Sequence, residues 1–137
     1  MLMPRLSLFC ARSMMLAGLL SVSSALWAQS APPDAPTSFP PEATTPTAAA
    51  LQTALAGKVF NVKLADGVTW RLQYQTNGYW FINTSRGFAD TGKWSTQDGQ
   101  LCGGGKRIKE TCNAMRLQGG TLYMQRDSGE VVVLVAE

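Results

Sequence analysis

The sequence predicts an all-β domain: a small antiparallel meander of about eight strands, closed as a barrel or folded as a sandwich, with one short N-terminal helix and one disulfide. Three observations lead to this prediction. Apolar residues recur with period two from Lys58 onward, the apolar runs are separated by Gly-containing turn dipeptides, and proline does not occur after Pro46. Such a pattern is typical of short strands joined by tight turns.

The first 28 residues have the three-part plan of a secretory signal peptide. Arg5 and Arg12 make the start basic, an apolar run follows over residues 14–22, and small residues lead up to Ala28. Cleavage after Ala28 or after Ser30 would fit the pattern. The apolar run is too short for a membrane span, so we expect a periplasmic or secreted chain that does not span the membrane after cleavage.

Residues 29–46 are rich in proline, alanine and threonine. Every proline except Pro4 lies between Pro32 and Pro46. A segment of this composition offers too little apolar surface to fold alone, which predicts a disordered, extended spacer. We therefore expect a signal peptide at 1–28, the spacer at 29–46 and a β-barrel domain at 47–137.

The first element of the domain is expected to be a helix from Ala48 to Ala56. Leu51 and Leu55 share one helix face at i, i+4, and Gly57 follows as a stop signal. A helix this short is not stable by itself, so it must dock on the rest of the domain.

The strands that follow are delimited by five turn dipeptides. These are Asp66-Gly67, Asn77-Gly78, Asp98-Gly99, Gly119-Gly120 and Ser128-Gly129. A three-residue loop at 65–67 sets Val62 opposite Trp70 and Phe60 opposite Leu72, which places these apolar residues on one face.

Two-residue turns are expected at the later dipeptides. At Asn77-Gly78 such a turn sets Tyr74 opposite Phe81 and leaves Trp80 and Ile82 on the outer face, beside Arg71. At the far end, Gly119-Gly120 pairs Leu117 with Leu122 and Met115 with Met124, whereas Ser128-Gly129 pairs Met124 with Val133 and Leu122 with Val135.

The cysteines predict one disulfide. Cys10 falls within the signal peptide, which leaves Cys102 and Cys112 as a pair in an exported chain. Closing this loop is expected to stabilise the small domain by about 3 kcal/mol in the chain-entropy model.

Composition excludes several classes of function. After removal of Arg5 and Arg12 the basic and acidic residues nearly balance, so we expect no nucleic-acid partner. The chain has no histidine, which removes the commonest general base and metal ligand. Predicted turns contain Asp66, Asp98 and Asp127. Backbone hydrogen bonding in a turn accounts for a short acidic side chain without a catalytic role. We therefore expect neither a cofactor nor a metal, and a non-enzymatic role, with an enzyme of unrecognised type as a minor alternative.

Two features are candidate contacts for a partner. Trp80 and Ile82, outward in the register above and beside Arg71, form either an exposed anchor or a dock for the helix. Lys106, Arg107 and Lys109 follow three glycines in an expected hairpin loop, which is either a solvated tip or a site for an anion or acidic partner.

The domain also resembles a known group of proteins. Gly92-Lys93-Trp94, then Cys102 and Cys112, then turns at Gly119-Gly120 and Ser128-Gly129 are similar to the layout of small secreted bacterial domains of unknown function with a lipocalin-like β-barrel fold. The chain is more weakly similar to periplasmic barrel-type inhibitors of proteases or lysozyme. The resemblance implies a fold and a compartment but no catalytic residue.

These observations lead to two expected functions. The first is an exported protein-binding or inhibitory module of the bacterial envelope, whose partner is an unknown envelope protein. The alternative is a small-ligand carrier, in which Trp70, Tyr74, Phe81 and Trp94 line a cavity. Because the domain is small, we expect the barrel interior to be packed rather than hollow. The sequence specifies neither the ligand nor the oligomeric state.

Overall fold

The computed structural model describes residues 32–137, so the predicted signal peptide, its cleavage sites and Cys10 lie outside the described residues. Eight antiparallel strands form one closed barrel in chain order, which confirms the predicted fold class and decides between barrel and sandwich. The elements are α1 (Ala48–Leu55), β1 (Lys58–Lys63), β2 (Thr69–Tyr74), β3 (Tyr79–Thr84), β4 (Ala89–Gln97), β5 (Gln100–Gly105), β6 (Thr111–Gln118), β7 (Thr121–Gln125) and β8 (Val131–Ala136).

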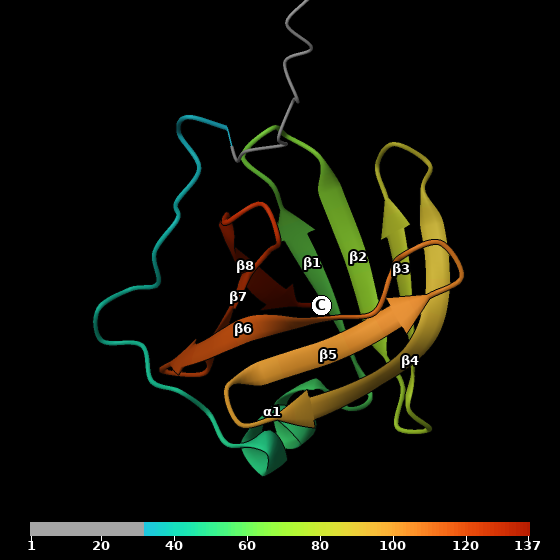
Figure 1. Cartoon of the computed structure of the whole chain (residues 1–137), viewed down its shortest axis with the longest axis horizontal. Coiled ribbons are helices and arrows are strands. Elements are labelled where there is room, and N and C mark those ends of the chain that lie inside the picture. Colours follow the sequence, from blue (N-terminus) through green and yellow to red (C-terminus); the bar gives the residue numbers. More distant parts are fainter. Residues whose placement is uncertain (1–31) are drawn as a thin grey trace, which may run out of the picture.

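The two ends of the barrel are built differently. In an up-and-down meander successive loops alternate between the ends, so the β1–β2, β3–β4, β5–β6 and β7–β8 loops belong to one end. Helix α1 lies across the other end (Figure 1). Leu51 and Leu55 are both 0% exposed there, and Thr47 caps the helix by accepting a hydrogen bond from the Ala50 N–H. The helix therefore docks on the domain through its two leucines, as expected, and α1 closes this end of the barrel.

The strand registers agree with the sequence at two turns. Val62 lies opposite Trp70 and Phe60 opposite Leu72, as the three-residue loop at 65–67 predicts. Leu117 lies opposite Leu122 across the Gly119-Gly120 turn, also as predicted.

The predicted registers at the other two turns are wrong by one residue. Gln75 and Tyr79 close a three-residue loop, in which Gly78 has a φ of 88° and so favours glycine. Tyr74 therefore lies opposite Trp80 instead of Phe81. The loop before Glu130 is likewise one residue longer than expected, so Met124 lies opposite Val132 and not Val133.

Trp80 and Ile82 consequently point into the barrel, and the expectation that they form an outer patch is wrong. They are 7% and 5% exposed, within the core cluster. A one-residue change of register moves every side chain of a strand to the opposite face. The observed register buries the tryptophan and the isoleucine, which together present more apolar surface than the phenylalanine that it leaves half-exposed.

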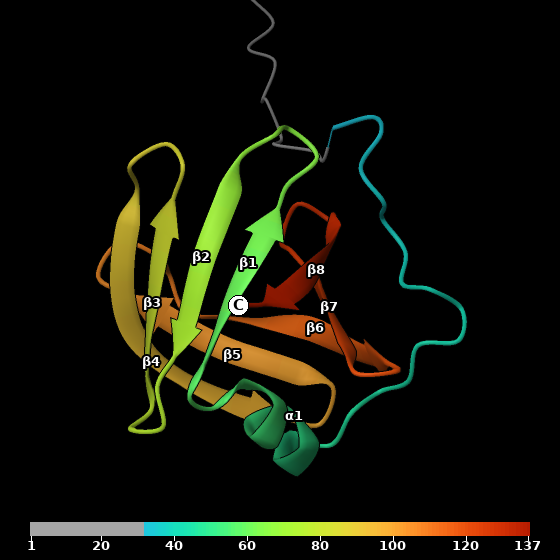
Figure 2. The same cartoon turned by 180° about the vertical axis from the view of Figure 1, so that it is seen from behind.

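The Pro-rich segment differs from the predicted disordered spacer over its described part. Residues 32–46 run along the side of the barrel and lead into α1 (Figures 1 and 2). Thr44 forms a β-bridge with Leu117, and the Val131 N–H donates to the Pro36 carbonyl oxygen. Two proline-initiated turns, closed by the Ala35 N–H on the Pro32 oxygen and the Ala43 N–H on the Pro40 oxygen, interrupt the segment, and backbone groups of β6 and β8 bind it to the barrel.

Covalent and membrane-related features complete the fold. Cys102 of β5 and Cys112 of β6 lie directly opposite each other and form the predicted disulfide. Among residues 32–137, we find no helix with the length and apolar character that a membrane crossing requires.

Candidate functional site

The interior of the barrel contains a cavity of about 830 Å³. Its lining reaches from Tyr74 and Trp94, near the end that α1 closes, to the exposed Asp66, Arg86 and Asp127 in the opposite loops. The cavity is therefore closed at one end and open at the other. The expectation of a fully packed interior is wrong, and the volume falls within the range of small-molecule sites.

Aromatic side chains gather at the closed end of the cavity. The rings of Tyr74 and Trp94 meet edge to face with centroids 5.3 Å apart, and Phe60 approaches Tyr74 at 6.2 Å. The indole N–H of Trp94 donates to the Gln75 carbonyl oxygen at 3.0 Å, and that of Trp80 donates to the Gly104 carbonyl oxygen at 3.1 Å. Both indoles thus satisfy their polar atom on the protein and turn apolar surface to the cavity.

Smaller and more polar side chains line the cavity towards the open end. Thr84, Thr111 and Asn113 belong to this half, together with Phe88 and Ile108. Trp70 of β2 also lies here, and the guanidinium of Arg126 sits over its ring at 4.6 Å from the centroid. The cavity therefore changes from aromatic and apolar at its base to mixed at its mouth.

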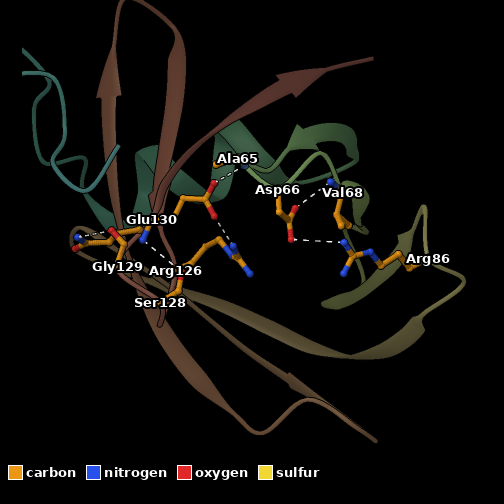
Figure 3. Close-up of polar contacts among 9 residues, drawn as sticks. Ala65, Asp66, Val68, Arg86, Arg126, Ser128, Gly129 and Glu130 are labelled. Carbon is orange, nitrogen blue, oxygen red and sulfur yellow. Dashed lines mark hydrogen bonds and ion pairs between the residues drawn. The ribbon is translucent and has the colours of Figure 1, made fainter. Parts of the chain in front are cut away.

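A buried carboxylate holds two loops of the mouth together. Glu130, 2% exposed, pairs with the Arg126 guanidinium and accepts a hydrogen bond from the Ala65 N–H at 2.7 Å (Figure 3). These contacts link the β7–β8 loop to the β1–β2 loop. Because the charge of Glu130 is paired and hydrogen-bonded, its burial does not leave an unsatisfied ion.

A second, more exposed ion pair lies in the same region. Arg86 of the β3–β4 loop approaches Asp66 at 3.9 Å, and Asp66 also accepts a hydrogen bond from the Val68 N–H at 3.0 Å (Figure 3). Exposed pairs at this distance contribute little to stability. Each of the two arginines that line the mouth nevertheless has a carboxylate of this chain beside it.

The β5–β6 loop carries Lys106, Arg107 and Lys109, all exposed as expected for a hairpin tip. Its backbone N–H groups surround the carboxylate of Asp90, which accepts from Lys106 at 3.1 Å, Arg107 at 3.0 Å and Ile108 at 2.8 Å. An anion cradle is thus present, but a side chain of the same chain occupies it. Desolvation by itself would raise the pKa of Asp90. The hydrogen bonds from the backbone N–H groups together have the larger effect, so the pKa is lowered.

Glycines at the end of β5 and at the facing position of β4 permit close approach of backbone and side chain. A Cβ at Gly105 would lie 2.3 Å from the Asp90 carboxylate, and one at Gly92 would lie 1.7 Å from the Gly104 carbonyl oxygen. Arg107 packs its guanidinium over the ring of Phe88 at 4.4 Å, which brings the basic loop to the cavity mouth. The loop is therefore an ordered part of the rim.

The candidate contacts from the sequence fall into three places. Trp80 and Ile82 line the cavity, the basic loop lies at its mouth, and Arg71 lies on the outer surface. Arg71 donates to the Glu137 carboxylate at 2.9 and 3.0 Å, and these hydrogen bonds lower the pKa of Glu137. The structure does not bring these residues together into one contact surface.

Sequence reasoning overlooked the residues of the mouth. Arg126 and Glu130 are separated by four positions across a turn, and only the correct loop length shows that they face each other. Asp90 gives little local signal, since the carboxylate accepts from the neighbouring Thr91 N–H but its other three partners lie 16 to 18 residues away. Within the described part of the chain, no group of three or more acidic or cysteine side chains could hold a metal ion.

Comparison with models of known protein families, with curated proteins and with solved structures finds no match to this chain. The function must therefore be argued from the geometry of the cavity.

Proposed function

We propose that this protein binds a small, largely apolar molecule inside the barrel and acts as a carrier or binding protein for it. The observation that supports the proposal is the cavity of about 830 Å³, closed by α1 and open at the opposite end. Eight-stranded barrels have an interior that is either filled by side chains or holds one small ligand. Here large side chains fill the base and leave space above them.

An uncharged fluorescent probe tests this proposal. N-phenyl-1-naphthylamine brightens when it leaves water, and we expect it to bind one site on the wild-type protein. Thr111→Trp places a large ring in the cavity and should weaken binding roughly tenfold or more. Val135→Trp adds the same ring to a residue of β8 that is 58% exposed, and should leave binding unchanged.

Two results would contradict the proposal. If Thr111→Trp bound the probe as tightly as the wild type, the probe would lie outside the cavity. If the wild type bound no probe, and native mass spectrometry of protein purified from its own cells released no small molecule, a carrier function would be wrong.

A protein-binding or inhibitory role in the bacterial envelope is the second proposal. The exposed side chains of Lys106, Arg107 and Lys109 favour it, although Trp80 is unavailable as its anchor. Replacing Lys106 and Lys109 by alanine should reduce the recovery of a specific partner, whereas Lys93→Ala, an exposed lysine of β4, should not. Unchanged recovery in both variants would remove the loop from the proposed contact surface.

A further inference from the structure

Arg126 is the more buried of the two arginines that line the cavity. Its side chain is 25% exposed, against 70% for Arg86. The guanidinium lies over the ring of Trp70, and its Nη1 donates to the buried carboxylate of Glu130. Figure 3 shows one terminal nitrogen of Arg126 turned to Glu130 and the other turned away from it. Because a guanidinium has five N–H donors, a ligand in the cavity meets a positioned donor whose charge is already balanced.

The base of the cavity suits the apolar part of a ligand. Trp80 and Trp94 line it, and both indole N–H groups already donate to backbone carbonyl oxygens. The charged residues of the lining all belong to loops of the open end; they are Asp66, Arg86, Arg126 and Asp127. A charged group at the base would be desolvated without a counter-ion, which is costly. The polar end of a ligand therefore belongs at the mouth, beside Arg126.

The charges of the mouth favour a head group without net charge. Arg126 pairs with Glu130, and Arg86 lies 3.9 Å from Asp66. Asp127 also lines the mouth, and the ion pairs among residues 32–137 do not include it. An anionic head would add a charge near these carboxylates, whereas a cationic head would lie against the guanidinium of Arg126. A neutral acceptor avoids both repulsions.

We infer that the ligand is an amphiphile with an uncharged, acceptor-bearing head, such as a primary amide, on an apolar chain. The chain packs in the base of the cavity, and the oxygen of the head accepts a hydrogen bond from Arg126 at the mouth. Hydrogen bonds from a charged donor are stronger than those from a neutral one, so Arg126 recognises the head where water also has access. This inference rests on the proposed carrier function and adds the class of ligand and the residue that recognises it.

Three ten-carbon probes test the charge of the head. Decanamide is neutral, whereas decanoate and decylammonium are charged at about pH 8. Isothermal titration calorimetry of the wild type should give a dissociation constant for decanamide about tenfold or more below that for either ion. A smaller difference, or a preference for either ion, would overturn the inference.

A charge-neutral double variant tests the role of Arg126. Arg126→Met with Glu130→Gln removes the guanidinium without leaving a buried carboxylate unpaired. It should weaken binding of decanamide about fivefold, the size of one net hydrogen bond, and change binding of N-phenyl-1-naphthylamine less than about twofold. Retained binding of the second probe also shows that the variant is folded. The matched control is Arg71→Met with Glu137→Gln, which removes an ion pair on the outer surface and should affect neither probe.

A brominated probe tests the orientation of the ligand. 10-Bromodecanamide carries a heavy atom at its apolar end, which quenches nearby tryptophans. In the variant Trp70→Phe, the tryptophans within residues 32–137 are Trp80 and Trp94, both at the base, so saturation with this probe should quench their fluorescence. Unquenched fluorescence would place the chain outside the base, and the inference would be wrong.

The results separate this inference from the carrier function. If decanamide and N-phenyl-1-naphthylamine both bind and the Arg126 double variant changes them equally or not at all, the inference is wrong while the carrier function stands. If the wild type binds N-phenyl-1-naphthylamine but not decanamide, the inference is again wrong alone. If it binds neither, both fail.

Discussion

Replacing Leu55 by alanine tests whether α1 forms the floor of the barrel. Leu55 is 0% exposed and packs in the same cluster as Leu51 and the interior residues of the strands. Alanine removes three buried carbon atoms and leaves a void, and such changes at fully buried leucines cost about 3 to 5 kcal/mol. We take the lower figure, because one side of the site is a short helix that is able to shift towards the void.

Urea unfolding followed by tryptophan fluorescence measures this cost. A loss of about 3 kcal/mol corresponds to a fall in Tm of roughly 12–24 °C for a domain of this size. Gln52→Ala provides the control, since Gln52 is exposed on the same helix and its truncation should change stability by less than about 0.5 kcal/mol. A loss below about 1 kcal/mol for Leu55→Ala would refute the docking of α1 on the core.

Three further predictions concern the covalent and charged contacts. Replacing Cys102 and Cys112 by alanine should cost about 3 kcal/mol in urea unfolding, and an unchanged midpoint would contradict a role for the disulfide in stability. Because folding lowers the pKa of Asp90, its carboxylate stabilises the fold above the pKa of the unfolded state and loses this effect as the pH falls. The difference in urea midpoint between wild type and Asp90→Asn should therefore shrink below about pH 4, and a constant difference would argue against the cradle. A double-mutant cycle of Arg126→Gln and Glu130→Gln should give a coupling of about 1 to 3 kcal/mol, whereas additive effects would show that the pair does not hold the mouth.

The fold class could be predicted because it depends on local patterns. Period-two apolar runs and glycine turns indicated a meander of short strands, and two apolar pairs in the first hairpin, Val62 with Trp70 and Phe60 with Leu72, indicated its register. The helix was predicted from two leucines and is one residue shorter than expected, ending at Leu55. The disulfide followed from two remaining cysteines, which the meander places directly opposite each other.

The candidate site could not be predicted because it depends on loop length. Asn-Gly is a strong signal for a two-residue turn, but here Thr76, Asn77 and Gly78 form a three-residue loop. The Asn77 side chain stabilises this loop by accepting a hydrogen bond from the Tyr79 N–H at 3.1 Å. One added residue turned Trp80 from a supposed surface anchor into part of the cavity wall. Counting the buried apolar surface of both registers would have favoured the observed one.

The cavity itself follows from an uneven distribution of volume along the barrel. Tyr74, Trp80 and Trp94 fill the base above α1, whereas Thr84 and Thr111 occupy comparable inward positions nearer the mouth. Average composition does not reveal such a gradient, which explains why the sequence favoured a packed interior. The space that these large side chains leave above the base favours a ligand within the barrel over a partner on its outer surface.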